Sequence, residues 1–94
     1  MALIKVRFYS LLSRGLDADT ITLQADDAQE ALLQVEKTFG SRIRRELESE
    51  GIRLDGELQD YCLILLNGTN IRNLKSTDLQ DGDTLHIFPR AIGG

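Results

Sequence analysis

Two glycines end the chain, Gly93 and Gly94, and a terminal Gly-Gly carboxylate is a group on which an enzyme can act. Glycine lacks a Cβ, so its backbone fits a narrow channel that bulkier residues could not enter. The pair closely follows Thr84–Phe88, a run with the character of a strand. This position indicates a carboxylate presented by a folded domain to a partner enzyme; the alternative is a frayed terminus.

The segment that follows the predicted last strand is long enough to reach from the domain surface into a partner's site. Pro89 to Gly94 is six residues, which extend by at most about 20 Å. Proline fixes its own φ and biases Phe88 toward an extended conformation, so the segment should leave the sheet straight. We therefore predict a domain over residues 1–88 and a flexible tail over residues 89–94. Gly94 would react, and the partner-binding residues of the tail would be Pro89, Arg90, Ala91, Ile92 and Gly93.

Composition limits the class of protein. Eleven basic and 15 acidic residues give a net charge of −4, which argues against nucleic acid as the main partner. The one cysteine excludes an internal disulfide, and the chain has too few ligands for a metal cluster. The longest apolar run, Cys62–Leu66, is too short to cross a membrane, and Met1–Lys5 shows no signal peptide. We expect a cytoplasmic protein without a metal site.

The first half of the chain predicts two strands and a helix. Apolar and polar residues alternate over Leu3–Tyr9 and Thr20–Gln24, as in half-buried strands, with a turn region bent at Gly15 between them. Apolar residues then recur at helical spacing over Asp27–Phe39. Asp27 resembles the first residue of a capping box, and Gly40 is expected to cap the end of this helix.

The second half predicts a shorter helix and three strands. In chain order these are a helix over Ser41–Glu50 that ends at Gly51, a loop over Leu54–Asp60, a central strand over Tyr61–Leu66, a short strand over Thr69–Ile71 and a last strand over Thr84–Phe88. Asn67-Gly68 predicts a tight turn, and Asp81-Gly82-Asp83 marks another. An EF-hand calcium site would need many more oxygen ligands than this second turn offers.

The element order and the ending Leu79–Gly94 resemble the ubiquitin-like β-grasp sulfur carriers, and in particular the MoaD family, the small subunit of molybdopterin synthase. The shared features are the Asp-Gly-Asp turn, a strand that ends in Phe88-Pro89, and Gly93-Gly94. The resemblance implies an α+β fold: a ubiquitin-like β-grasp with a mixed sheet of about five strands packed on one main helix, and an extended Gly-Gly tail.

The resemblance also implies a sulfur carrier that is not a catalyst by itself, although it would be the small subunit of an enzyme if it joins molybdopterin synthase. An E1-like adenylating enzyme of the MoeB/ThiF type would use ATP and magnesium to form an acyl-adenylate on Gly94. Sulfur from a persulfide donor would replace AMP and leave a thiocarboxylate. A large synthase subunit of the MoaE type, or another acceptor, would take the sulfur. The carrier would bind no cofactor of its own.

Other functions stay open. Arg90 stands where many synthase subunits carry a second proline, so the chain resembles other carrier branches as well, which feed thiamine, cysteine or tRNA thiolation. A second class is a protein modifier joined to lysines through Gly94. A third is a plain interaction module whose terminal glycines are incidental.

Strand alternation predicts a docking face beside the tail. If Leu85, Ile87, Ile64 and Leu66 face the helix, the outer side carries Phe88, His86, Leu65, Leu63 and Tyr61. Apolar residues gathered on an exposed face are typical of a partner site. The alternative is a second apolar layer covered by Leu54–Asp60.

Three further candidates have structural interpretations. Cys62 is expected to be a buried strand residue rather than a nucleophile. His86 has no catalytic partner at a suitable spacing and is expected to be a half-exposed strand residue. The basic group is expected to form a solvated face paired with nearby glutamates; it consists of Arg42, Arg44, Arg45 and Arg53, and the glutamates are Glu46, Glu48 and Glu50.

Overall fold

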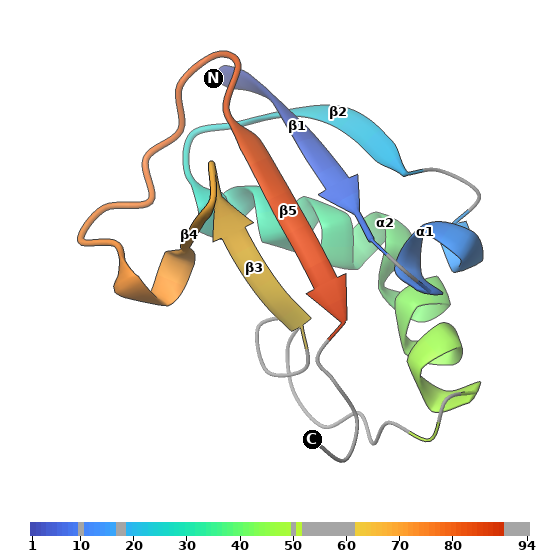
Figure 1. Ribbon diagram of the computed structural model, residues 1–94. Helices are drawn as coiled ribbons and strands as arrows, with labels where there is room; N and C mark the ends of the chain where they lie inside the picture. The colour runs from blue at the N-terminus through green and yellow to red at the C-terminus, as the bar shows by residue number, and fades with distance from the viewer. Residues whose placement is uncertain (10, 17–18, 50, 52–61, 90–94) are drawn as a thin grey trace.

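A mixed five-stranded sheet covers one side of the molecule, and a long helix packs across its other side (Figure 1). The computed structural model describes residues 1–9, 11–16, 19–49, 51 and 62–89. The strands are β1 (Ala2–Phe8), β2 (Thr20–Ala25), β3 (Cys62–Leu66), β4 (Thr69–Asn70) and β5 (Thr84–Pro89). They lie in the order β2-β1-β5-β3-β4, with β1 and β5 parallel and the other pairs antiparallel. The predicted sheet packed on one main helix is confirmed.

The core lies between the inner face of the sheet and the helix. Alternation buries one side of β1, β3 and β5. The buried strand residues include Ile4, Val6, Phe8, Cys62, Ile64, Leu85 and Ile87. The helix contributes small and branched residues opposite them, such as Ala31 and Val35. β5 is the central strand, and β3 lies beside it rather than at the centre of the sheet.

The main helix, α2 (Ala28–Ser49), is longer than predicted, and the expected break at Gly40 is wrong. The two predicted helices are one element of 22 residues. The reason is packing: Ile43 and Leu47 continue the apolar stripe and are fully buried. Their burial outweighs the helix penalty of one glycine, about 1 kcal/mol.

The ends of α2 agree with the sequence. The backbone N–H of Glu30 donates to the Asp27 carboxylate at 2.8 Å, which is the expected N-terminal cap. At the other end Gly51 has a φ of +81°, and its N–H donates to the carbonyl of Glu48 at 3.0 Å. A left-handed glycine of this kind commonly stops a helix.

Two shorter elements differ from expectation. The predicted turn region after β1 contains a helix, α1 (Leu11–Leu16), with Gly15 inside it. Leu12 and Leu16 lie one helical turn apart and are both buried, which explains the helix. A 3₁₀ helix (Ile71–Asn73) follows β4, so the short strand ends before Ile71. The predicted loop Leu54–Asp60 lies outside the described residues.

Candidate functional site

β5 carries the strand part of the candidate site. It pairs with β1 on one side and β3 on the other, so it is held along both edges. Leu85 and Ile87 are fully buried against the helix. Alternation therefore turns Thr84, His86 and Phe88, each half-buried, to the opposite side of the sheet. We call this side the outer face.

The Asp81-Gly82-Asp83 turn anchors the start of β5. The Asp81 carboxylate accepts the backbone N–H of Leu3 at 2.8 Å, which ties the turn to β1. The Asp83 carboxylate accepts the N–H of Gln80 at 2.8 Å and the side-chain amide of Asn67 at 3.0 Å. These bonds show that the motif fixes the register of β5, as a turn would.

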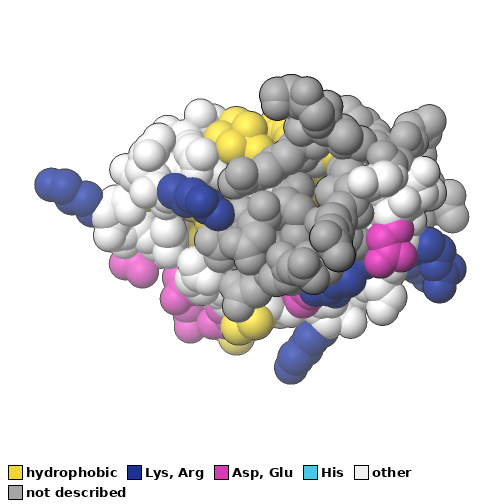
Figure 2. Space-filling model, turned by 90° about the horizontal axis from the view of Figure 1, so that it is seen from below, with side chains coloured by type: hydrophobic (Ala, Val, Ile, Leu, Met, Phe, Trp, Pro, Cys, Tyr) yellow, Lys and Arg dark blue, Asp and Glu magenta, His cyan; other side chains and the backbone are white. Residues whose placement is uncertain are grey.

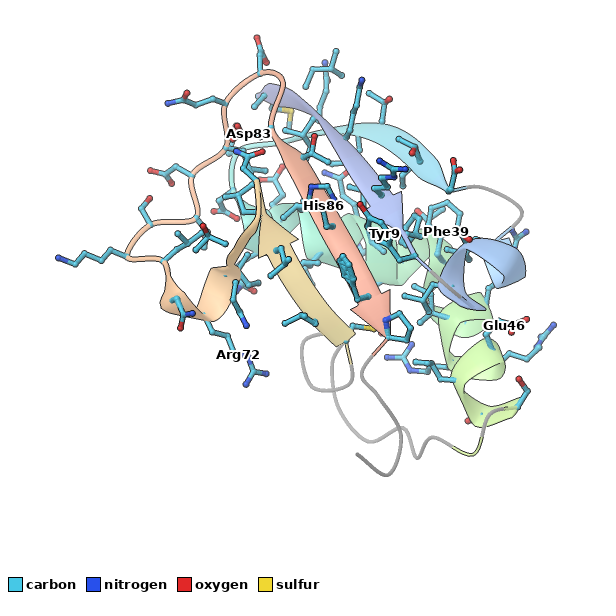
Figure 3. All side chains as sticks on the ribbon, in the orientation of Figure 1. Tyr9, Phe39, Glu46, Arg72, Asp83 and His86 are labelled. Atoms are coloured by element: carbon cyan, nitrogen blue, oxygen red, sulfur yellow. The ribbon has the colours of Figure 1, made fainter. Side chains whose placement is uncertain are left out.

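The turn between β3 and β4 completes this anchor. Asn67 and Gly68 both have positive φ, as a tight hairpin turn requires, which confirms the predicted turn. The Asn67 side-chain oxygen accepts the N–H of Thr84 at 3.0 Å. One side chain thus links the hairpin to the first residue of β5 (Asp83 and its neighbours are seen in Figure 3).

An aromatic cluster lies on the outer face where β1 ends (Figure 3). The rings of Tyr9 and Phe88 are stacked, with centroids 4.1 Å apart and planes within 3°. The Tyr9 hydroxyl and His86 Nδ1 form a hydrogen bond of 2.7 Å. The Arg7 guanidinium lies 5.3 Å from the centre of the Tyr9 ring, within the range of a cation–π contact. His86 is therefore a half-buried strand residue with a tyrosine partner.

Two leucines extend the cluster across β3. Leu63 lies opposite Phe88 and Leu65 opposite His86 in the sheet register. Leu63 is 37% exposed and Leu65 is half-buried. The structure thus brings four predicted docking residues together on one face: Leu63, Leu65, His86 and Phe88. Their role in docking stays a prediction, and Tyr61 lies outside the described residues.

The sequence analysis did not select the residues that β1 adds to this face. Lys5 and Arg7 are exposed beside β5, and Tyr9 stacks on its end. Alternation already placed these three on one side of β1. Only the parallel pairing of β1 with β5 shows that this side adjoins His86 and Phe88. No outward position of the five described strands carries a carboxylate, so the charged residues on this face of the strands are basic although the chain is acidic.

The far end of β5 leads toward the predicted tail. Pro89 is the last residue of β5, one residue beyond the predicted strand, and it pairs with Cys62. Figure 2 views this end of the molecule, where hydrophobic side chains reach the surface and both basic and acidic side chains lie around them. The predicted tail residues Arg90, Ala91, Ile92, Gly93 and Gly94 lie outside the described residues. The boundary between domain and tail therefore stays a prediction.

Comparison with known families decides the class of protein. The sequence model of the ThiS family matches residues 17–94, most of the chain, through the terminal glycines. The chain belongs to the ThiS family. Among curated proteins, "Small archaeal modifier protein 3" of Haloferax volcanii is 30% identical over an alignment of 98 positions, which covers 97% of this chain and 98% of that protein.

Solved structures agree with this ThiS-family assignment. The small archaeal modifier protein 1 of Methanosarcina acetivorans is 26% identical, with a TM-score of 0.72 over 100% of this chain and 98% of that one. A chain in the complex of subunits 1 and 2 of the molybdopterin-converting factor of Helicobacter pylori is 24% identical, with a TM-score of 0.61 over 98% and 99%. The ThiS-family chain thus has the ubiquitin-like β-grasp fold, and the predicted resemblance to β-grasp sulfur carriers is confirmed.

Two remaining candidates of this ThiS-family chain, Cys62 and Arg44, contribute to its packing. Cys62 is 2% exposed, as expected of a core residue. Arg44 forms an ion pair with Glu36, two helical turns earlier, a partner that the sequence analysis did not name; the predicted pairing of the basic group with Glu46, Glu48 and Glu50 stays a prediction. Gly40 lies between Glu36 and Arg44, and the space where its Cβ would stand is taken by the Arg44 guanidinium. Arg53 lies outside the described residues.

Two further properties concern ligands and membranes. Within the described residues, no group of three or more His, Cys, Asp or Glu side chains is placed to hold a metal ion. The helices in the same part of the chain include none that is both long and apolar enough to span a bilayer.

Proposed function

We propose that this ThiS-family chain is a sulfur carrier that acts through the carboxylate of Gly94, with molybdopterin synthesis as its pathway. The observation that carries the proposal is the family match, which extends through Gly93 and Gly94. The outer face supports it, because apolar residues of β5 and β3 and basic residues of the neighbouring β1 lie together beside the predicted tail.

The chemistry explains why partners are required. At neutral pH the α-carboxyl is ionised, since its reference pKa is about 3.3–3.7, and a carboxylate does not accept a sulfur nucleophile. An adenylating enzyme of the MoeB/ThiF type would use ATP and magnesium to join AMP to Gly94, releasing pyrophosphate. The terminal sulfur of a persulfide would attack the carbonyl, and AMP would leave. A thiol would then cleave the resulting acyl disulfide, leaving a thiocarboxylate on Gly94 and a disulfide on the donor.

The chain's own contribution is binding and positioning. β5 is held on both edges and anchored at its start by the Asp81–Asp83 turn. This fixes the position of Pro89, the residue directly before the rest of the predicted tail. A partner that takes up Gly94 approaches the end of β5, where Phe88, Tyr9 and Leu63 offer apolar contacts. Lys5, Arg7 and the predicted tail residue Arg90 favour an acidic partner surface beside that contact.

The expected partners are the adenylating enzyme, a persulfide donor and a large subunit of the MoaE type. The Helicobacter pylori relative was solved as a complex of its two subunits, which supports a protein acceptor of this kind. In this scheme the chain binds no cofactor, and ATP and magnesium belong to the activating enzyme.

The test is reconstitution with intact-mass measurement. The full chain, an adenylating enzyme, ATP, magnesium, a persulfide donor and a thiol should yield a product in which one oxygen of Gly94 is exchanged for sulfur. The matched control lacks Gly94 and should remain unmodified while keeping its fold. An unchanged mass for the full chain in a system that thiolates a known carrier would refute the proposal. Transfer of the sulfur to a pterin precursor by the large subunit would then test the pathway.

A second candidate function is conjugation to proteins through Gly94. The supporting observation is that the relatives at 30% and 26% identity are both named modifiers, whereas the molybdopterin-converting factor chain is 24% identical. A modifier would appear in cells as a ladder of isopeptide-linked products on lysines. Ladders without any thiocarboxylate, under handling that preserves thiocarboxylates, would favour conjugation over sulfur transfer.

A further inference from the structure

The edge strand β2 is an open pairing surface, separated by β1 from the predicted docking residues on β5 and β3. β2 lies at one margin of the sheet, with β1 on its inner side and no described element beyond it (Figure 1). The opposite margin is different, because β4 has only two residues and runs directly into a 3₁₀ helix. β2 is thus the one edge, among the described strands, that is long enough to receive another strand.

The hydrogen-bond pattern shows which backbone groups of β2 are available. The N–H of Phe8 donates to the carbonyl of Asp19 at 2.8 Å, and Ile21 and Leu23 follow at alternate positions opposite Val6 and Ile4. In an antiparallel pair, alternate residues face the partner strand. Residues 19, 21, 23 and 25 therefore bond to β1, and residues 20, 22 and 24 direct their N–H and C=O groups away from it.

A side chain of α2 marks one end of this open row. The Gln34 side-chain amide donates to the carbonyl of Gln24 at 2.6 Å, which independently confirms that residue 24 faces away from β1. The N–H and C=O of Thr20 and Thr22, and the N–H of Gln24, remain on the open side. They match the row of bonds that an added strand would form.

The composition of β2 does not protect this edge. Natural edge strands are usually blunted by lysine, proline, a bulge or short length. The strand Thr20–Ala25 has six residues and contains no charge, no proline and no glycine. Its β-branched residues Thr20, Ile21 and Thr22 favour the extended conformation. The open edge is therefore preformed for pairing.

Charge selects the occupant. Exposed carboxylates stand at both ends of the strand, Asp19 before it and Asp26 after it, the latter 3.5 Å from the N-terminal amine. If a second copy paired antiparallel about Thr22, Asp19 of one copy would lie opposite Ala25 of the other, one residue from its Asp26. Each end of the paired strands would then hold two carboxylates, which repel each other. A strand with a basic residue at each end complements both carboxylates instead.

We propose that β2 binds an extended segment of a partner protein by strand addition, and that this segment carries Lys or Arg at both ends of an uncharged, β-branched stretch. The two carboxylates are separated by about 23 Å along an extended strand, which sets the length of the segment. The site goes beyond the proposed sulfur transfer and does not depend on Gly94.

The probe is an acetylated peptide of sequence Lys-Thr-Val-Thr-Val-Thr-Val-Lys, titrated into the isotope-labelled full chain. Amide resonances of Thr20, Thr22 and Gln24 should shift, and their N–H groups should exchange more slowly with solvent. A peptide with glutamate at both ends should bind about three- to tenfold more weakly, since exposed ion pairs contribute modestly. Shifts confined to Leu63, Leu65, His86 and Phe88, or equal affinity for both peptides, would overturn the proposal.

Two variants sharpen the test. Thr22→Pro removes an N–H that faces away from β1, so the sheet should persist while peptide binding is lost; Thr22→Val keeps the N–H and should bind normally. The double variant with Asp19→Lys and Asp26→Lys should instead prefer the glutamate-ended peptide. This measurement stays informative even if the Thr22→Pro variant does not fold. Equal peptide binding by a folded Thr22→Pro would refute strand addition. Concentration-dependent protection of Thr22 without peptide would show that a second copy is the occupant.

Discussion

Truncation of Leu63 tests the outer face as the docking surface. Full burial of a leucine side chain contributes about 1.5–3 kcal/mol. Leu63 is already largely covered within the domain and is 37% exposed. A partner can therefore bury only about a third of the side chain, worth about 0.5–1 kcal/mol. Leu63→Ala should weaken binding to the adenylating enzyme about two- to fivefold.

A charge at the same position should have a larger effect. Leu63→Glu loses the same apolar contact and also places a carboxylate against the partner. Burying a polar group without a hydrogen-bond partner costs a further 1–3 kcal/mol, approximately. The combined loss corresponds to more than about tenfold in the dissociation constant.

The assay is titration calorimetry of each variant against the adenylating enzyme, with urea unfolding measured in parallel to separate binding from stability. The matched controls are Leu33→Ala and Leu33→Glu. Leu33 is 62% exposed on α2, on the other side of the sheet from Leu63. These controls should bind like the parent chain. Equal affinity for Leu63→Glu and the parent, or equal losses at both leucines, would refute the outer face as the docking surface.

Two further predictions concern stability. Asn67→Ala should lower the free energy of unfolding by about 1–3 kcal/mol, because it removes the hydrogen bonds to Asp83 and Thr84 and puts alanine at a φ of +50°. Urea unfolding should place Asn67→Gly, which tolerates that φ, between the parent and Asn67→Ala; an alanine variant as stable as the parent would contradict this. Gly40→Ala should change stability by less than about 1 kcal/mol, since the gain in helix propensity opposes displacement of the ion-paired guanidinium. The free energy of unfolding of Gly40→Ala should also lose the salt dependence that the Arg44–Glu36 ion pair contributes. A salt dependence equal to that of the parent would show that the pair persists.

The sequence predicted the elements whose local signals agree with their burial. Alternation in β1, β3 and β5 assigned the inner and outer sides correctly, because side chains of a strand alternate with a period of two in any sheet. The Asn67-Gly68 turn and the Asp27 cap were equally local, since each depends on a few neighbouring residues.

The predictions based on glycine were wrong where tertiary contacts outweighed the low helix propensity of that residue. Gly40 carries the signal of a helix end, yet α2 continues through it because Ile43 and Leu47 are buried on the same stripe. Gly15 likewise lies inside α1, where Leu12 and Leu16 are buried. A single residue's preference of about 1 kcal/mol is smaller than the gain from burying two branched side chains.

The sequence alone therefore determined the β-grasp class of the chain, the burial of Cys62 and the side of the sheet on which Leu63, Leu65, His86 and Phe88 lie. Only the tertiary structure showed which residues of other strands lie next to these four residues. The parallel pairing of β1 with β5 brings Arg7 and Tyr9 to His86 and Phe88, and the same pairing leaves β2 at the open edge of the sheet. The physical reason is that a strand's own pattern fixes which way its side chains point, whereas its neighbours are chosen by contacts between residues far apart in the chain.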